Sequence, residues 1–275
     1  MLAWCLLSLE FARSMIICVG AWPVVQSVAA GDADQGFELC YLEVPDAERC
    51  VSPGLWPGLR PEEFLPVRGF RWARGQGHLP GLWWSATTGA HVGYESWLER
   101  DHVMLLDFDP EVVAIAAQPF WLRWRDGSGR SRRHVPDLFA RMADGSAVVI
   151  DVRPDDRIEP RDAEAFEATG QACELAGWCF VRAGVPDPVR MANVGWLSRY
   201  RHQRCGSADM ARLLLKVFAE PAPLVAGAAA AGDPLSVLPV LFHLLWRHVL
   251  AVDLAVRLTA ETLVSVGSRA CGGGR

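Results

Sequence analysis

The spacing of apolar and polar residues divides the middle of the chain into helical and extended segments. Between residues 92 and 106 apolar positions recur every three or four residues, which predicts a helix. Residues 111–124 alternate well enough for a strand, while residues 134–142 and 146–153 predict the two strands of a hairpin. The hairpin turn is expected at Ala143-Asp144-Gly145.

Helical spacing returns over residues 160–176, and a short apolar strand follows over residues 178–184. The order helix, three strands, helix, strand predicts an α/β sandwich whose central strands form a meander. In the C-terminal part, residues 221–234 are rich in Ala, Gly and Pro, so we interpret them as a linker. A last helix is expected to begin at Thr259, whose hydroxyl suits an N-cap.

These segments suggest three parts of the chain. Residues 1–64 form an N-terminal segment, in which residues 31–66 are rich in Gly, Pro and acids and are interpreted as irregular. Residues 65–184 form the α/β domain, and residues 185–275 form a helical C-terminal domain.

Composition limits the function classes. The chain has 275 residues, of which 51% are hydrophobic, and a net charge of -5, so a protein that coats nucleic acid by bulk charge is excluded. Any DNA contact must be a local patch. The eight cysteines show no CxxC or zinc spacing, which favours reduced, mostly buried thiols in a cytoplasmic protein. The first thirty residues are apolar, but Glu10 and Arg13 interrupt them, so no membrane anchor is expected.

The hairpin carries the candidate chemistry. With a three-residue turn Asp137 lies opposite Asp151, and Arg153 shares their face; with a two-residue turn Asp137 faces away. Two carboxylates about 5 Å apart repel each other, and a divalent cation such as Mg²⁺ removes that repulsion. The alternative is an ordinary solvated ion pair between Asp151 and Arg153 at the end of a strand.

A further acid comes from the preceding helix. The segment YESWLERD places Glu95 and Glu99 one turn apart on one helix face, where either could also form a surface ion pair. Arg153 keeps a positive charge beside the acids and can hold a phosphate oxygen. With a pKa above about 12, however, it cannot act as a general acid or base.

In combination these pieces resemble a known family. The segments RGQGH, SATTG, YESWLERD, Gln118-Pro119, HVPDLF and DGSAVVIDVRP resemble the TnsA-like endonuclease subunit of heteromeric transposases. The resemblance covers about residues 65–265. It implies a restriction-endonuclease-like PD-(D/E)xK core, followed by a winged-helix-like C-terminal region matched by residues 241–264.

The resemblance also implies site residues and partners. Catalytic positions fall on Glu99 (with Glu95 as the alternative), Asp137, Asp151 and Arg153, where Arg153 replaces the family's lysine. Mg²⁺, or Mn²⁺ as a substitute, would be held by the three acids and the backbone carbonyl of Val152. The implied partners are the DNA of the transposon ends, a DDE-type transposase that cuts the 3' ends, and an AAA+ ATPase. A catalytically silent adaptor and a free-standing restriction or repair nuclease remain alternatives.

Two basic segments are candidates for contact with the DNA backbone. Arginines and tryptophans alternate in the loop of residues 66–91, and again around the turn of residues 121–133. The alternatives are a lid packed by its tryptophans and a solvated hairpin tip, respectively. The expected contact residues are Arg74, Gln76, His78, Arg132 and Arg133. His134, close by, is expected to flank DNA or solvent rather than to bind a metal.

Overall fold

The computed structural model describes residues 36–69, 80–267 and 269. The chain divides into two compact units. Unit 1 contains the described residues up to Leu106 together with Glu111–Pro186, and unit 2 contains Asp107–Pro110 and the residues from Asp187 onward. The two units are described separately below.

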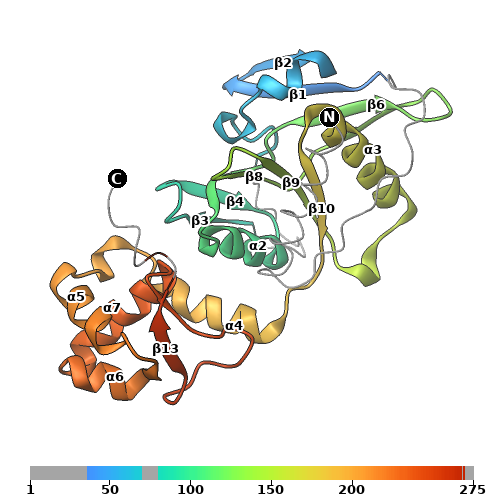
Figure 1. Ribbon diagram of the computed structural model, residues 1–275. Coiled ribbons are helices and arrows are strands. Elements are labelled where there is room, and N and C mark those ends of the chain that lie inside the picture. The colour runs from blue at the N-terminus through green and yellow to red at the C-terminus, as the bar shows by residue number, and fades with distance from the viewer. Residues whose placement is uncertain (1–35, 70–79, 268, 270–275) are drawn as a thin grey trace, which may run out of the picture. The chain divides into compact units, whose positions relative to one another are not determined.

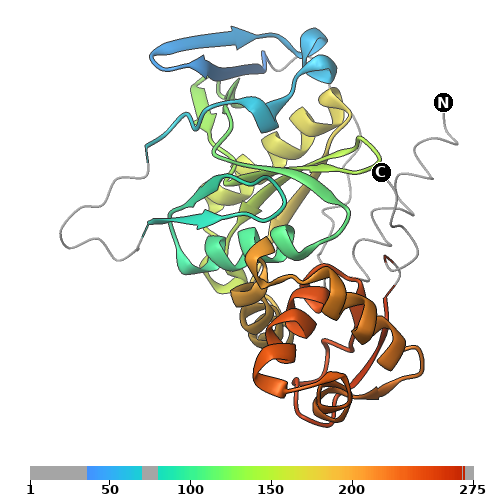
Figure 2. The ribbon, with the colours of Figure 1, turned by 90° about the vertical axis from the view of Figure 1, so that its left-hand side faces the viewer.

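The central sheet of unit 1 has four strands in the order β10-β9-β8-β5. Strand β8 is antiparallel to both β5 and β9, while β10 runs parallel to β9. Helices α2 and α3 lie on opposite sides of this sheet (Figures 1 and 2). The elements are α2 (Trp97–Phe108), β5 (Val112–Ala117), β8 (Leu138–Met142), β9 (Ala147–Val152), α3 (Pro160–Ala176) and β10 (Cys179–Ala183), with a short 3-10 helix at Asp155–Arg157.

The alternation of side chains along these strands produces two apolar cores. Phe139 and Val149 pack with the residues of α3, whereas Leu138 and Ile150, each one position away, pack with Val103 of α2. Both faces of β8 and β9 are therefore buried, which explains why the sequence of β9 is continuously apolar up to Asp151. The predicted α/β class is confirmed.

A second four-stranded sheet has the order β2-β1-β6-β7. Its strands are β1 (Glu38–Val44), β2 (Ala47–Val51), β6 (Trp121–Arg125) and β7 (Ser131–His134), and two 3-10 helices (Pro53–Gly58, Pro61–Glu63) and the β3/β4 hairpin (Gly81–Trp84, His91–Tyr94) complete unit 1.

Two predictions fail in this second sheet. The single strand expected over residues 111–124 is two strands in two sheets, because the chain turns at Gln118, whose φ is 49°. Residues 31–66 are not irregular throughout, since β1 pairs with both β2 and β6. Consequently β5 and β8 are neighbours in the central sheet but not in sequence, because β6 and β7 lie between them in the chain.

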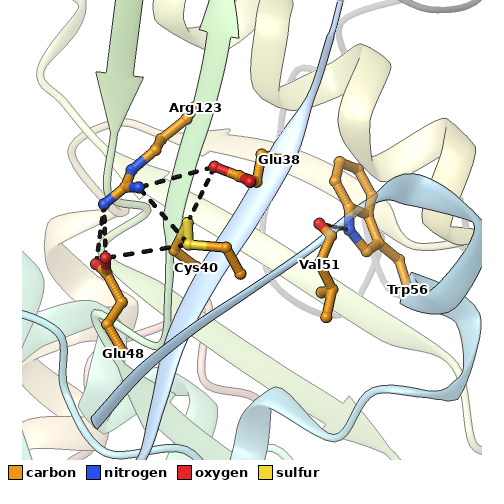
Figure 3. Close-up of a disulfide and its surroundings, with 7 residues drawn as sticks. Glu38, Cys40, Glu48, Val51, Trp56 and Arg123 are labelled. Atoms are coloured by element: carbon orange, nitrogen blue, oxygen red, sulfur yellow. Dashed lines mark hydrogen bonds and ion pairs between the residues drawn. A yellow bond between two sulfur atoms is a disulfide. The ribbon is translucent and has the colours of Figure 1, made fainter.

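The β1/β2 hairpin also contains a disulfide. Cys40 and Cys50 are direct cross-strand partners with a Cα–Cα distance of 4.0 Å, and they are bonded to each other. Figure 3 shows the bridge beside Arg123, which donates hydrogen bonds to both carboxylate oxygens of Glu48 at 3.0 and 2.8 Å. The prediction of reduced thiols is therefore wrong for this pair, because the hairpin register brings together two cysteines that show no motif spacing.

Unit 2 combines helices with a small sheet of order β11-β13-β12. Its helices are α4 (Pro188–Leu197), α5 (Ala208–Val217), α6 (Leu224–Ala231) and α7 (Pro234–Trp246), with 3-10 turns at Ser198–Tyr200 and Gln203–Cys205. Its strands are β11 (Ala222–Pro223), β12 (Leu250–Ala251) and β13 (Leu263–Val266).

Two predictions fail in unit 2 as well. Residues 221–234 are not a linker, because they form β11 and α6, and α6 buries Leu224 and Ala228. No helix begins at Thr259, because residues 263–266 pair with β11 and β12 as strand β13. The buried Asn193 fixes the preceding loop by donating to the carbonyls of Leu254 and Val256 at 2.9 and 2.8 Å.

No single helix in the described part of the chain is long and apolar enough to cross a membrane. Helices α6 and α7, which meet at an angle of 120°, pass that test of length and composition only as a pair. Core helices of a folded protein have the same composition, and eight residues of α7 are buried within its unit.

The surroundings of one glycine in α6 and one in α3 predict opposite effects of substitution by alanine on stability. A Cβ at Gly227 would overlap the ring of the buried Phe218, so Gly227→Ala should lower the free energy of unfolding by about 1–3 kcal/mol. Gly170 of α3 has its nearest neighbour at an ordinary 3.7 Å, so Gly170→Ala should raise it by up to about 1 kcal/mol. Urea denaturation followed by tryptophan fluorescence measures both. Equal stability of Gly227→Ala and the unchanged chain would contradict the packed α6.

Candidate active site

The register of the β8/β9 hairpin determines how its two acids lie. Leu138 pairs with Ile150 and Arg141 pairs with Ala147, so the turn contains the three residues Ala143-Asp144-Gly145. Gly145 adopts a left-handed φ of 87°, which glycine accepts without strain. Extending the register by one pair places Asp137 opposite Asp151, as the three-residue alternative predicts.

Asp137 is held at the end of β8 by backbone hydrogen bonds. The N–H of Val152 donates to its Oδ2 at 2.8 Å, and its own carbonyl accepts from the N–H of Gln118 at 3.0 Å. Loss of hydration and the negative charges of Asp151 and Glu99 raise its pKa well above the ordinary value. Asp151 and Glu99 are therefore both close enough for their charges to act on Asp137.

Glu99 lies in the first turn of α2 and is 9% exposed. Its Oε2 accepts from the N–H of Glu95 at 2.7 Å, its Oε1 accepts from the hydroxyl of Ser96 at 2.8 Å, and its N–H donates to that hydroxyl. Ser96 and Glu99 thus form a variant of the capping box, which the spacing S-x-x-E could have revealed. Burial raises the pKa of Glu99, an effect that these hydrogen bonds oppose.

The helix expected from residue 92 begins only at Trp97, so Glu95, the alternative acid, precedes α2 and does not share a helix face with Glu99. Glu95 forms an ion pair with Arg68, with 2.6 Å between Nη2 and Oε2, and its side chain is 33% exposed. The positive charge of Arg68 opposes the pKa increases that burial causes in Asp137 and Glu99. The Nε of Arg68 has no hydrogen-bond partner among the described residues. Arg68 is therefore a cation of the acid cluster that the sequence pattern did not single out.

Arg153 follows Asp151 on the same strand but points to a different acid. Its Nη2 lies 3.3 Å from Oδ1 of Asp162 in the first turn of α3, and its side chain is 44% exposed. Its backbone N–H donates to the carbonyl of Ala183 in the parallel strand β10. The ordinary alternative, an ion pair between Asp151 and Arg153, does not form, because Arg153 pairs with Asp162 instead.

Asp151 instead meets His134. The Nε2 of His134 lies 2.8 and 2.9 Å from the two carboxylate oxygens of Asp151. Asp151 is 2% exposed, whereas the side chain of His134 is 24% exposed. The sequence did not predict this contact, which forms because strand β7 ends where the imidazole of His134 reaches across to β9.

Gln118 is a second residue with an unusual environment. It has a left-handed φ of 49°, it is 1% exposed, and both polar atoms of its side-chain amide lack a hydrogen-bond partner among the described residues. Its backbone N–H donates a hydrogen bond to the carbonyl of Asp137, and its carbonyl accepts one from the N–H of Val67. A strained, buried and unpaired amide next to a candidate acid is typical of a functional position.

The predicted DNA contacts are only partly described. Arg74, Gln76 and His78 lie outside the described residues. Arg132 binds Asp126 at 2.9 Å and lies 3.5 Å from Glu164, so its charge is largely neutralised. The guanidinium of Arg133, which belongs to β7, lies over the ring of Trp121 in β6, 4.6 Å from the ring centroid.

The sequence of this region matches a family model described as TnsA-like endonuclease N terminal, over residues 109–182. Residues 109–182 are thus similar to a TnsA-like endonuclease N-terminal domain. The match includes Asp137, Asp151 and Arg153, whereas Glu99 lies ahead of it. A comparison with curated proteins finds no matching relative.

The carboxylates of the matched region and of helix α2 are chemically suitable ligands for a divalent cation. Two hard carboxylates face each other at the end of the hairpin, a third lies nearby, and their mutual repulsion is relieved when a cation binds. The ligand atoms are not gathered tightly, however. Among the described residues, the group of three whose ligand atoms lie within 4.8 Å of one another is Glu38, Cys40 and Cys50, and the two sulfurs are already bonded to each other. Binding would thus need side-chain rotation in the acid cluster.

The raised pKa of Asp137 predicts that the stability of unit 1 depends on pH. The folded-state pKa exceeds the unfolded value, so stability is greatest at low pH and falls as pH rises above about 4 and through the folded pKa. In the presence of a chelator, Asp137→Asn should unfold at a higher temperature than the unchanged chain, and the difference should grow towards neutral pH. Thermal melts at several pH values measure this. The same difference in melting temperature between the two proteins at every pH would contradict the repulsion.

Proposed function

We propose that this chain is the metal-dependent DNA endonuclease subunit of a heteromeric transposase and hydrolyses phosphodiester bonds at the 5' ends of a transposable element. The TnsA-like endonuclease match supports nuclease chemistry in transposition. The observation that carries the proposal is the apposition of Asp137 and Asp151 in the three-residue register, with Glu99 acting electrostatically on Asp137.

The residues have separate roles in this proposal. Asp137 and Asp151 would hold a Mg²⁺ ion, with Glu99 and the carbonyl of Val152 as further oxygen ligands. The ion would supply Lewis acidity at a phosphodiester oxygen and a more acidic bound water. The N–H of Val152, which donates to Asp137, keeps one oxygen of that carboxylate directed along the strand end. Ser96 and the N–H of Glu95 orient Glu99.

Two arginines are candidates for the cation that stabilises the negative charge of the transition state. Arg153 occupies the family's lysine position, but Asp162 binds it on the α3 side. Arg68 is the arginine whose charge acts on both Asp137 and Glu99. Neither guanidinium can take a proton from water, so both act by charge and hydrogen bonding.

Unit 2 is proposed to be winged-helix-like and to serve mainly as a docking domain for a protein partner. The order α5, β11, α6, α7, β12, β13 supports the first part. Helix α7 contains neither Arg nor Lys and buries most of its side chains, so it lacks the groups that read DNA bases. In this proposal the partners are the DDE-type transposase and the AAA+ ATPase, and the DNA contacts lie mainly in unit 1.

A catalytically silent adaptor is the second candidate function. Two observations favour it. Arg153 replaces the family's lysine and binds Asp162. The hydrogen bonds of Glu99 at the start of α2 explain its presence without a catalytic role. A free-standing nuclease keeps the chemistry without the partners. Genes for a DDE-type transposase and an ATPase next to this one would favour the transposase subunit over the free-standing enzyme.

Cleavage of an element end by the assembled transposase, with Mg²⁺ or Mn²⁺, tests the proposal. Asp137→Asn should reduce the rate by more than about 10–100-fold, because it removes a direct ligand rather than an outer partner. Glu99→Gln should also reduce it strongly, whereas Glu167→Gln on the exposed face of α3 should leave it unchanged. Strand cleavage is followed on denaturing gels.

The outcomes separate the candidates. Absence of cleavage by the unchanged, folded chain with every metal tested would favour the adaptor. Undiminished cleavage by Asp137→Asn would refute the assigned site, and a larger loss in Glu95→Gln than in Glu99→Gln would reassign the helix acid.

The two arginines are distinguished by matched substitutions. Arg68→Gln should slow cleavage by about 100-fold, the cost of losing a charge that acts on the reacting centre. Arg153→Gln should have a smaller effect, since its charge is compensated by Asp162, and Arg153→Lys should retain activity. The reverse order of effects in the same cleavage assay would mean that Arg153 leaves Asp162 when DNA binds.

A further inference from the structure

The contact between His134 and Asp151 joins two sheets of unit 1. His134 is the last residue of β7, which pairs with β6, whereas Asp151 belongs to β9 of the central sheet. The imidazole thus reaches the acid cluster from a strand that supplies none of the family's site residues. Its Nε2 is directed at both oxygens of a carboxylate that is 2% exposed.

The distances in this contact are those of a hydrogen bond, and they also allow both groups to bind one ion. Two ligand atoms that lie about 2.1 Å from a metal and at right angles to each other are about 3.0 Å apart. The distances from Nε2 of His134 to the oxygens of Asp151 are 2.8 and 2.9 Å. An ion could therefore bind both side chains without a movement of the backbone.

We propose that His134 is a nitrogen ligand of the metal site formed with Asp151 and Asp137, which makes the site selective for Mn²⁺ over Mg²⁺. This inference rests on the proposed function, since it assumes that the acid cluster binds a metal. Mg²⁺ strongly prefers oxygen ligands, whereas the later first-row ions accept imidazole nitrogen. An imidazole also adds a neutral donor where a fourth carboxylate would increase the repulsion among the acids.

The position of the second sheet explains how His134 is placed. Leu122 of β6 pairs with His134 and is fully buried in the core that contains Phe139. The β6/β7 hairpin is therefore anchored to the same core as the central strands. Val135 and Pro136, which connect His134 to Asp137, are buried as well. His134 and Asp137 are thus two ends of one short, fixed connection.

The test measures metal binding rather than activity. Pulsed electron paramagnetic resonance of Mn²⁺ added to the full chain should show coupling to a nitrogen nucleus. The coupling should disappear in His134→Gln and persist in His91→Gln, a control on the exposed β4 residue. The affinity for Mn²⁺ should fall by about tenfold or more in His134→Gln. The affinity for Mg²⁺, measured by competition with Mn²⁺, should change much less.

Each outcome has a defined meaning. Nitrogen coupling that is lost in His134→Gln alone supports the ligand. Mn²⁺ bound without nitrogen coupling, but lost in Asp137→Asn, overturns the inference and leaves the proposed function intact. Absence of Mn²⁺ binding by the folded, unchanged chain overturns both. If a variant fails to fold, the unchanged chain still tests the inference, because bound Mn²⁺ without nitrogen coupling overturns it.

Discussion

The register of one hairpin is the constraint on which the candidate site depends. The N–H of Met142 donates to the carbonyl of Ser146 at 2.9 Å and closes a three-residue turn in which Gly145 takes the left-handed conformation. Side chains alternate between the two faces of a strand, so a turn shorter by one residue would turn Asp137 away from Asp151. The same alternation sends Phe139 and Val149 to one core and Leu138 and Ile150 to the other. Core packing and site geometry therefore enforce the same register.

The acid cluster is electrostatically unfavourable unless something compensates it. Burial and two neighbouring carboxylates raise the pKa of Asp137, and the described residues compensate through backbone N–H groups, Ser96, His134 and Arg68. Repulsion of this kind lowers the stability of the fold and is typical of sites where a cation or substrate completes the arrangement. Gln118, which has a strained backbone and donates a hydrogen bond to the carbonyl of Asp137, also lowers the stability of this region.

Elements distant in sequence supply the support for this region. Strand β1 pairs with β6, so the described N-terminal residues are part of the α/β unit and Trp56 enters the core that lies between the sheet and α3. The β6/β7 hairpin interrupts the succession of central strands and delivers His134 to Asp151. In unit 2, Phe218 packs against Gly227 in the segment that resembles a linker by composition, and the hydrogen bonds of Asn193 hold the loop that precedes β13.

The sequence by itself determined the α/β class and the hairpin around Ala143-Asp144-Gly145, but it left a two-residue and a three-residue turn open, and the register of the structure places Asp137 opposite Asp151. These features follow from local periodicity and turn chemistry, which act over a few residues. The tertiary structure decided the break at Gln118, the pairing of β1 with β6, the Cys40–Cys50 bridge and the helical nature of residues 224–231. It also decided which partners the charged residues meet, with Arg153 bound to Asp162, Arg68 beside the acids and His134 on Asp151. Such contacts join residues far apart in the chain, and their energies depend on burial and neighbours that no local pattern contains.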